Sequence, residues 1–187
     1  MTPTPLSHLK PLYAVASAVP AVDSAVRLSL NPALDRRGTV DGAWWPHSHD
    51  AAAELPGLIA AVDQQLGRTT LRVGMHRDTW DHIPRRIPAR GRQVRVGWFR
   101  HTDPRVITLS LADAEPIVLL VIPPGTARVP AEAALKLATQ DTTGFAPADL
   151  LTIAHIPAAP CGGEDASLVW ENEGGRTVVT PAARPVG

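Results

Sequence analysis

Two histidines, His47 and His49, stand one residue apart in the segment VDGAWWPHSHD, and two aspartates, Asp41 and Asp50, flank them. Imidazole and carboxylate groups are the ligands of many divalent-metal sites. An H-x-H pair suits a strand, where side chains two residues apart point the same way, but this pair follows a proline and precedes an expected helix. Polar residues at such a position commonly cap a helix. We therefore predict no metal and no other cofactor, and keep His47 and His49 as alternative metal ligands.

The same segment contains two adjacent tryptophans, Trp44 and Trp45. Adjacent side chains on a strand point to opposite faces, so one indole is expected in the core. The other is expected over a sheet edge, a helix or a cleft. In the functional interpretation this second indole forms the wall of a binding pocket, with Trp80 or Trp98 opposite and Asp41 nearby. That pocket would belong to a small-molecule binder or a metal-dependent hydrolase.

A basic segment, PRRIPARGRQVRVGWFRHTDPR, contains seven arginines and one acidic residue. On a strand, Arg95 would project to the face opposite Val94 and Val96, and Trp98 and Phe99 would offer stacking surfaces. This mixture is typical of an anion or single-stranded nucleic-acid surface. The alternative is a solvated face whose charges pair with acids elsewhere. The arginines expected to be mostly exposed are Arg85, Arg86, Arg92, Arg95 and Arg100. The binding candidates are Arg92, Arg95, Arg100 and Trp98.

No catalytic signature is recognisable in the chain. It contains no GxSxG, P-loop, HExxH or dinucleotide fingerprint. Ser48 lies between two histidines, but a catalytic triad requires proximity in space rather than in sequence. Cys161 lies in a Pro- and Gly-rich stretch without groups that would activate its thiol. We leave enzymatic activity open and favour a protein that is not an enzyme.

The composition sets the broad class. The chain has 187 residues, 44% of them hydrophobic, which suffices for one domain with a substantial core. Its 18 basic and 18 acidic residues cancel, which argues against a dedicated nucleic-acid binder or a polybasic membrane clamp. A single cysteine rules out a disulfide framework and agrees with a cytoplasmic location. The apolar run PLYAVASAVPAV is interrupted by a proline, and no run is long enough to cross a bilayer.

Two short strands and a helix are expected in the first third of the chain. The alternation in SAVRLSL predicts a strand. TVDGAWW predicts a second strand, with a turn or bulge at Asp41-Gly42. An apolar stripe at helical spacing then predicts a helix over residues 49–66, bent at Pro56 and ended by Gly67.

After this helix the apolar period changes to two, which predicts four strands, TTLRVGM, RQVRVGWF, VITLSL and IVLLVI. Short connections favour antiparallel neighbours, and ADAEP is typical of a hairpin turn. The uniformly apolar IVLLVI is expected at the centre of the sheet, covered on both faces. Further helices are expected over residues 130–140 and in PADLLTIAH. The fold class is α+β, with a mainly antiparallel sheet of about five to six strands and two to three helices packed against it.

These elements divide the chain into three parts. Residues 1–22, rich in Pro, Ala, Ser and Thr, are expected to form a flexible arm. Residues 23–156 are expected to form a single α+β domain. Residues 157–187 are expected to be mostly irregular, although SLVW and RTVV can pair as a short hairpin.

The motifs of the chain resemble those of an actinobacterial domain-of-unknown-function family, family 5994. The resemblance rests on RLSLNP, on VDGAWWPHSHDAAAELPGLIAAVDQQLG, and on IPRRI, GRQVRVGWFR, DP, LLVIPPG and ENEGG after it. It spans residues 26–175, which is most of the chain. Members often carry arginine where this chain has His47 or His49, so the resemblance implies that these histidines are not a metal site common to the family. It implies no activity.

We interpret the chain as a small cytoplasmic, non-enzymatic binding or regulatory protein, with another protein as the favoured partner. One alternative is a nucleic-acid-associated protein that uses the arginine-rich segment 85–105. The other is a small-molecule binder or metal-dependent hydrolase with a pocket near VDGAWWPHSHD. No membrane partner is expected.

Overall fold

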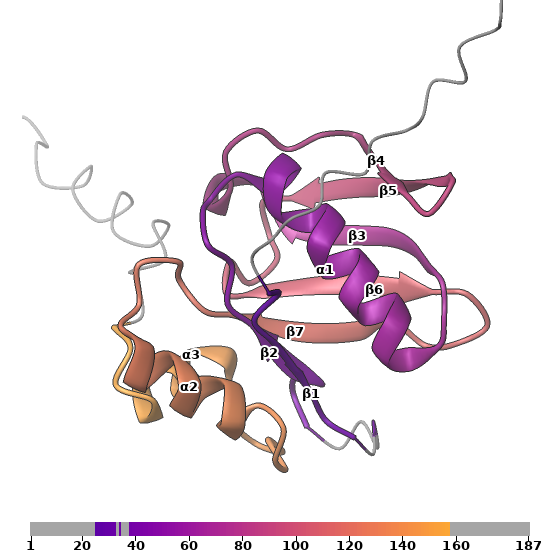
Figure 1. Cartoon of the computed structure of the whole chain (residues 1–187). Coiled ribbons are helices and arrows are strands. Elements are labelled where there is room, and N and C mark those ends of the chain that lie inside the picture. The colour runs from indigo at the N-terminus through magenta and orange to yellow at the C-terminus, as the bar shows by residue number, and fades with distance from the viewer. Residues whose placement is uncertain (1–24, 33, 35–37, 158–187) are drawn as a thin grey trace, which may run out of the picture.

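The computed structural model describes residues 25–32, 34 and 38–157. The arm expected over residues 1–22 and the hairpin of SLVW and RTVV lie outside these residues. The described part of the chain forms seven strands, three α-helices and one 3-10 helix (Figure 1). None of its helices is both long and apolar enough to span a membrane. The elements, in chain order, are β1 (Leu28–Leu30), β2 (Gly42–Trp44), α1 (Ala51–Leu66), β3 (Thr70–His76), η1 (Arg77–Thr79), β4 (Arg86–Ala89), β5 (Arg92–Phe99), β6 (Val106–Leu111), β7 (Ile117–Val121), α2 (Arg128–Leu137) and α3 (Pro147–Ile153).

The seven strands form one mixed sheet in the order β1-β2-β7-β6-β3-β5-β4. Four neighbouring pairs are antiparallel, whereas β2 and β7, and β3 and β5, run parallel. The α+β class, the four strands predicted after α1 and the hairpin between β6 and β7 are confirmed. The prediction of a mainly antiparallel sheet of five to six strands is correct only in part, because the sheet has seven strands and includes two parallel pairs.

Strand β4 accounts for much of this difference. The sequence pattern did not predict it, because RIPA contains a proline, which is compatible only with special places in a sheet such as an edge strand. Arg90 and Gly91, with φ angles of 45° and 77°, form the tight turn that joins β4 to β5. Strand β4 lies at the outer edge of the sheet, and the hairpin brings β5 back into the space between β4 and β3. Strand β5 therefore pairs with β3 and runs parallel to it.

Helix α1 packs on one face of the sheet (Figure 1). The Asp50 carboxylate caps it by accepting hydrogen bonds from the backbone N–H groups of Ala52 and Ala53, at 2.9 and 3.2 Å. Gly67, with φ 61°, ends it, and Pro56 lies within it. The predicted apolar stripe is confirmed, and each side chain buried in this way stabilises the fold by roughly 1.5–3 kcal/mol. The buried stripe consists of Leu55, Leu58, Ile59 and Val62.

Helices α2 and α3 pack on the opposite face. Small side chains of α2, Ala131 and Ala134, are fully buried there together with Leu120 and Ile122 from β7 and the residue after it. The alternate β7 residues, such as Leu119, are buried in the α1 cluster. Strand β7 is therefore covered on both faces, as the uniformly apolar IVLLVI predicted, and it lies inside the sheet between β2 and β6.

This second helical layer covers only part of its face. Its cluster contains side chains from β2, from β7 and from the first residue of β6, Val106, but none from β3, β4 or β5. On those three strands, the residues that alternate with the core positions are exposed or half-exposed. We call this face of β4, β5 and β3, which no other described element covers, the open face.

Candidate functional site

The adjacent tryptophans are both buried, on opposite faces of the sheet. Trp44 is 1% exposed and belongs to the cluster under α1, whereas Trp45 is 8% exposed and belongs to the cluster under α2 and α3. The Trp44 ring stacks on Trp80, with ring centroids 5.3 Å apart and planes 12° apart. The predicted alternation is confirmed, and it makes both indoles part of the packing.

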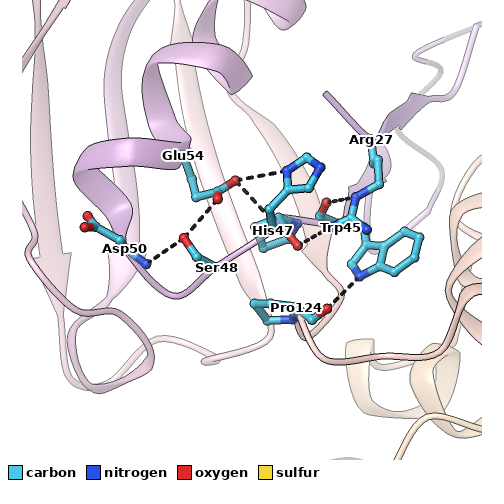
Figure 2. A network of polar contacts seen from close by, with 8 residues as sticks. Arg27, Trp45, His47, Ser48, Asp50, Glu54 and Pro124 are labelled. Atoms are coloured by element: carbon cyan, nitrogen blue, oxygen red, sulfur yellow. Dashed lines mark hydrogen bonds and ion pairs between the residues drawn. The ribbon is translucent and has the colours of Figure 1, made fainter. Parts of the chain in front are cut away.

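Trp45 is held in place by Arg27, the residue before β1 (Figure 2). The guanidinium carbon lies 3.5 Å from the centre of the Trp45 ring, and Arg27 Nε donates to the Trp45 carbonyl oxygen at 3.0 Å. The indole N–H donates to the Pro124 carbonyl oxygen at 3.4 Å. Burial lowers the pKa of Arg27, and the Glu54 carboxylate acts in the opposite direction. Arg27 remains a cation that stabilises the tryptophan.

The two histidines lie just before α1, and His47 belongs to a network of polar contacts around Glu54 (Figure 2). The Glu54 carboxylate accepts hydrogen bonds from the His47 backbone N–H at 3.1 Å and from the Ser48 hydroxyl at 2.9 Å. His49 Nδ1 lies 3.2 Å from the Thr79 carbonyl oxygen. Within the described ranges, no three His, Cys, Asp or Glu side chains are grouped so that they could hold a metal. These polar residues organise the start of the helix.

Asp41 and Gly42 also have structural roles in the sheet. The Asp41 carboxylate accepts a hydrogen bond from the Val118 N–H at 2.8 Å, and the residue is only 9% exposed. Gly42 lies in β2, in regular register with both neighbouring strands, so the predicted turn or bulge at Asp41-Gly42 is wrong. Glycine is needed there because a Cβ atom would lie 2.2 Å from the Ser29 carbonyl oxygen.

Arg92 does not lie on the open face, contrary to the expectation that it is exposed. It points toward α1, as Val94 does, and its Nη2 atom donates to Asp63 Oδ2 at 2.6 Å and to the Thr70 carbonyl oxygen at 2.9 Å. The Asp63 side chain is only 5% exposed and also accepts from the Thr70 N–H and hydroxyl. Arg92 neutralises a buried carboxylate, which explains its position.

Three other arginines lie in register across the open face. Arg86 is paired with Arg95 across β4 and β5, and Arg95 is paired with Arg72 across β5 and β3. All three are exposed, and none forms an ion pair or a side-chain hydrogen bond with another described residue. Like charges directly opposite one another destabilise a sheet. We call Arg86, Arg95 and Arg72 the arginine row.

Phe99 lies beside the arginine row. Its side chain alternates with that of Trp98 and so shares the open face with Arg95, and it is 52% exposed. The ring lies over Gly74 and Gly97, where added Cβ atoms would be 3.6 and 3.7 Å from it. The two glycines provide a flat backbone surface for the ring, which remains half exposed on the face that also carries the arginine row.

The basic segment alone does not reveal this arrangement. Arg72 lies in a different strand, and only the pairing of β3 with β5 brings it beside Arg95. Its alternation with Val73 and Met75 could have placed it on a polar face, but not beside a particular neighbour. Arg100 is exposed but lies beyond the end of β5, where its carbonyl oxygen is 3.1 Å from His76 Nε2.

Trp80 and Trp98, the remaining tryptophan candidates, line a pocket of about 380 Å³. It lies where the parallel strands β3 and β5 end, and we call it the tryptophan pocket. Asp41, Trp44 and Trp45 do not line it, so it is not the pocket predicted at their segment. Its lining residues are Arg77, Asp78, Trp80, His82, Ile83 and Trp98.

The described residues thus define an α+β protein whose seven-stranded mixed sheet carries helices on both faces and an open, arginine-bearing area. Residues 27–138 match the model of DUF5994, a family of unknown function. The chain belongs to this family, which confirms the resemblance predicted from its motifs. The matched region includes the open face and the tryptophan pocket. No curated protein and no solved structure matches the chain.

Proposed function

We propose that this protein is a non-enzymatic binding protein whose ligand-binding surface is the open face. The observation that carries the proposal is the arginine row. Arg95 stands directly between Arg86 and Arg72, and none of the three side chains is paired with an acid among the described residues. This arrangement costs stability in the free protein, since like charges face one another. An anionic ligand would remove that cost on binding.

The acids of the chain support this interpretation, although the total charge is zero. Several carboxylates are engaged in the scaffold rather than exposed beside the arginine row. Asp63 accepts from Thr70 and Arg92, Asp41 accepts from β7, and Glu54 accepts from the start of α1. The neutral total therefore coexists with a local basic surface, and it is local charge that attracts an anionic ligand.

We further propose that the ligand is a single-stranded nucleic acid. Neighbouring strands are about 4.8 Å apart, so the arginine row is roughly 10 Å long and can contact successive phosphates. Phe99 offers a half-exposed ring on which a base can stack. Cations beside an aromatic ring are the combination with which proteins bind unpaired strands. A cytoplasmic location, which the single cysteine of the chain supports, would give access to RNA.

The proposal is tested by fluorescence anisotropy with a labelled oligouridylate, comparing the full chain with two triple variants. R72Q/R86Q/R95Q removes the arginine row. R68Q/R128Q/K136Q removes the same charge from exposed positions outside the strands. We expect only the first variant to lose affinity. The slope of log affinity against log salt should become shallower by about 2, since each phosphate contact contributes about 0.7 for a single strand. Equal losses in both variants would refute a site on the open face.

The contribution of the aromatic ring is tested separately. F99A should weaken oligouridylate binding by about 1–3 kcal/mol, the range for one stacked base. V129A, which truncates a 79% exposed side chain on α2, should leave binding unchanged. If F99A has no effect and polyglutamate competes as well as oligouridylate does, the open face binds acidic polymers by charge alone, and an acidic protein partner replaces nucleic acid as the proposed ligand.

A further inference from the structure

The tryptophan pocket combines charges of both signs with aromatic surface. Arg77 and Asp78 follow β3 directly, and Trp98 lies near the end of β5. Neither the Arg77 guanidinium nor the Asp78 carboxylate has an ion-pair or hydrogen-bond partner among the residues that the structure describes. The carboxyl ends of parallel strands are a common place for ligand sites in α/β sheets.

The walls of this pocket are held in place before any ligand arrives. Trp80 stacks on the buried Trp44, and the residue after it is anchored to the start of α1. The Asp81 N–H donates to the His49 carbonyl oxygen at 2.8 Å, and the Asp81 carbonyl oxygen accepts from the Ala51 N–H at 3.1 Å. A preformed site avoids much of the entropy cost of ordering its groups on binding.

The short helix η1, which carries both charged residues, is fixed in a similar way. His76 Nδ1 accepts a hydrogen bond from the Asp78 N–H at 3.2 Å, and the Thr79 hydroxyl lies 3.5 Å from the Pro104 carbonyl oxygen, to which it donates. His82, which also lines the pocket, adopts a φ of 43°, in the left-handed region. Its Nδ1 atom lies 3.6 Å from Asp50 Oδ2. The charged groups are thus presented from constrained backbone.

We infer that the tryptophan pocket binds a small zwitterion with a planar apolar group, the chemistry of a free aromatic amino acid. Arg77 would receive the carboxylate, Asp78 the ammonium group, and the Trp98 indole the ring. A ligand with a carboxylate alone would bring that charge close to the Asp78 carboxylate, and a ligand with an ammonium group alone would bring it close to the Arg77 guanidinium. In either case the second charge of the pocket would have no partner of opposite sign. The volume of about 380 Å³ lies in the lower part of the range for small-ligand pockets, about 300–1,000 Å³. This inference does not depend on the open face.

The test is an NMR titration that follows the indole N–H signals of the full chain with four probes. L-Phenylalanine carries the ring and both charges, 3-phenylpropanoate lacks the ammonium group, 2-phenylethylamine lacks the carboxylate, and L-alanine lacks the ring. We expect L-phenylalanine to shift the Trp98 and Trp80 signals with about millimolar affinity. Each of the other probes should bind about tenfold more weakly, because each lacks one recognised group. Equal binding of L-phenylalanine and either singly charged probe overturns the zwitterion assignment.

Variants locate the site. R77Q, D78N and W98L should each weaken L-phenylalanine binding by about tenfold. R68Q and D113N make the same charge changes at an exposed arginine and aspartate that do not line the pocket, and they should bind as the parent does. R72Q/R86Q/R95Q should also bind normally, which separates this site from the open face. Loss of binding in these controls, or normal binding in all three pocket variants, overturns the inference.

Discussion

At the scale of single residues, Arg92 and Arg95 show how one strand places the same side chain in two environments. They are three residues apart in β5, so their side chains point to opposite faces of the sheet. Arg92 has a side chain that is 26% exposed and compensates the buried carboxylate of Asp63. Arg95 is exposed and stands between two other cations. Identical chemistry therefore stabilises the fold in one case, and in the other it supplies a cation of the proposed ligand-binding surface.

The pair gives a direct stability prediction. R92A should lower the free energy of unfolding by about 2–4 kcal/mol, because it leaves the Asp63 carboxylate buried without its cation. R95A should not lower it, because Arg95 is exposed and stands between two like charges. Urea denaturation of both variants measures the difference. Equal, small losses would show that the contact between Arg92 and Asp63 contributes little in solution.

The two adjacent tryptophans give a second prediction. W44A and W45A should each destabilise the protein by about 3–5 kcal/mol, because each indole is buried in a different cluster and its removal leaves a cavity. W98A, at a half-exposed position, is the control and should cost less. Thermal and urea unfolding measure all three. A loss below about 1 kcal/mol for either Trp44 or Trp45 would contradict the buried position described here for that residue.

At the scale of the elements, the pairing of β1 with β2 depends on a close backbone contact. Gly42 approaches the Ser29 carbonyl oxygen so closely that any Cβ atom would overlap it. G42A should therefore cost about 1–3 kcal/mol through displacement of β1, as overpacked substitutions do. G125A is the matched control, since a Cβ atom there has no neighbour within 4 Å. Hydrogen exchange of the β1 amides measures the displacement, and unchanged protection in G42A would contradict it.

The elements also show how far the sequence predicts this structure. Periods of two and of 3.6 predicted β3, β5, β6, β7 and the helices, since apolar side chains must reach one core. Strand β4 was not predicted, because Pro88 and flanking arginines obscure the pattern of an edge strand. The parallel pairs could not be predicted either, because order and direction are set by contacts between distant segments.

The candidate sites show the same limit. The sequence identified Arg95, Trp80 and Trp98 as residue types suited to binding, but it could not place Arg72 beside Arg95. That contact follows from the register of two strands separated by η1 and β4. The sequence also led us to group Arg92 with the exposed arginines, because its buried partner, Asp63, lies on a different element. The type of a residue can be read from its own position in the sequence, whereas the partner of a charged side chain depends on how distant segments fold together.

At the scale of the whole molecule, the arginine row predicts a salt-dependent gain in stability when its charge is removed. R72Q/R86Q/R95Q should be more stable than the parent by about 0.2–1 kcal/mol at low ionic strength, since two pairs of facing like charges are lost. The gain should shrink in high salt, where exposed charges are screened. Urea denaturation at two salt concentrations measures both effects. A less stable variant would mean that these arginines have stabilising partners in the folded chain.

Strand β4 has a consequence for how copies of this protein meet in concentrated solution. It forms one border of the sheet that the described residues make, where a foreign strand could extend the hydrogen-bonded ladder and start aggregation. Pro88 has no N–H to offer such a strand, and the exposed charge of Arg86 beside it repels a second copy. The opposite border, β1, is only three residues long. Both borders therefore have features by which natural sheets resist joining edge to edge.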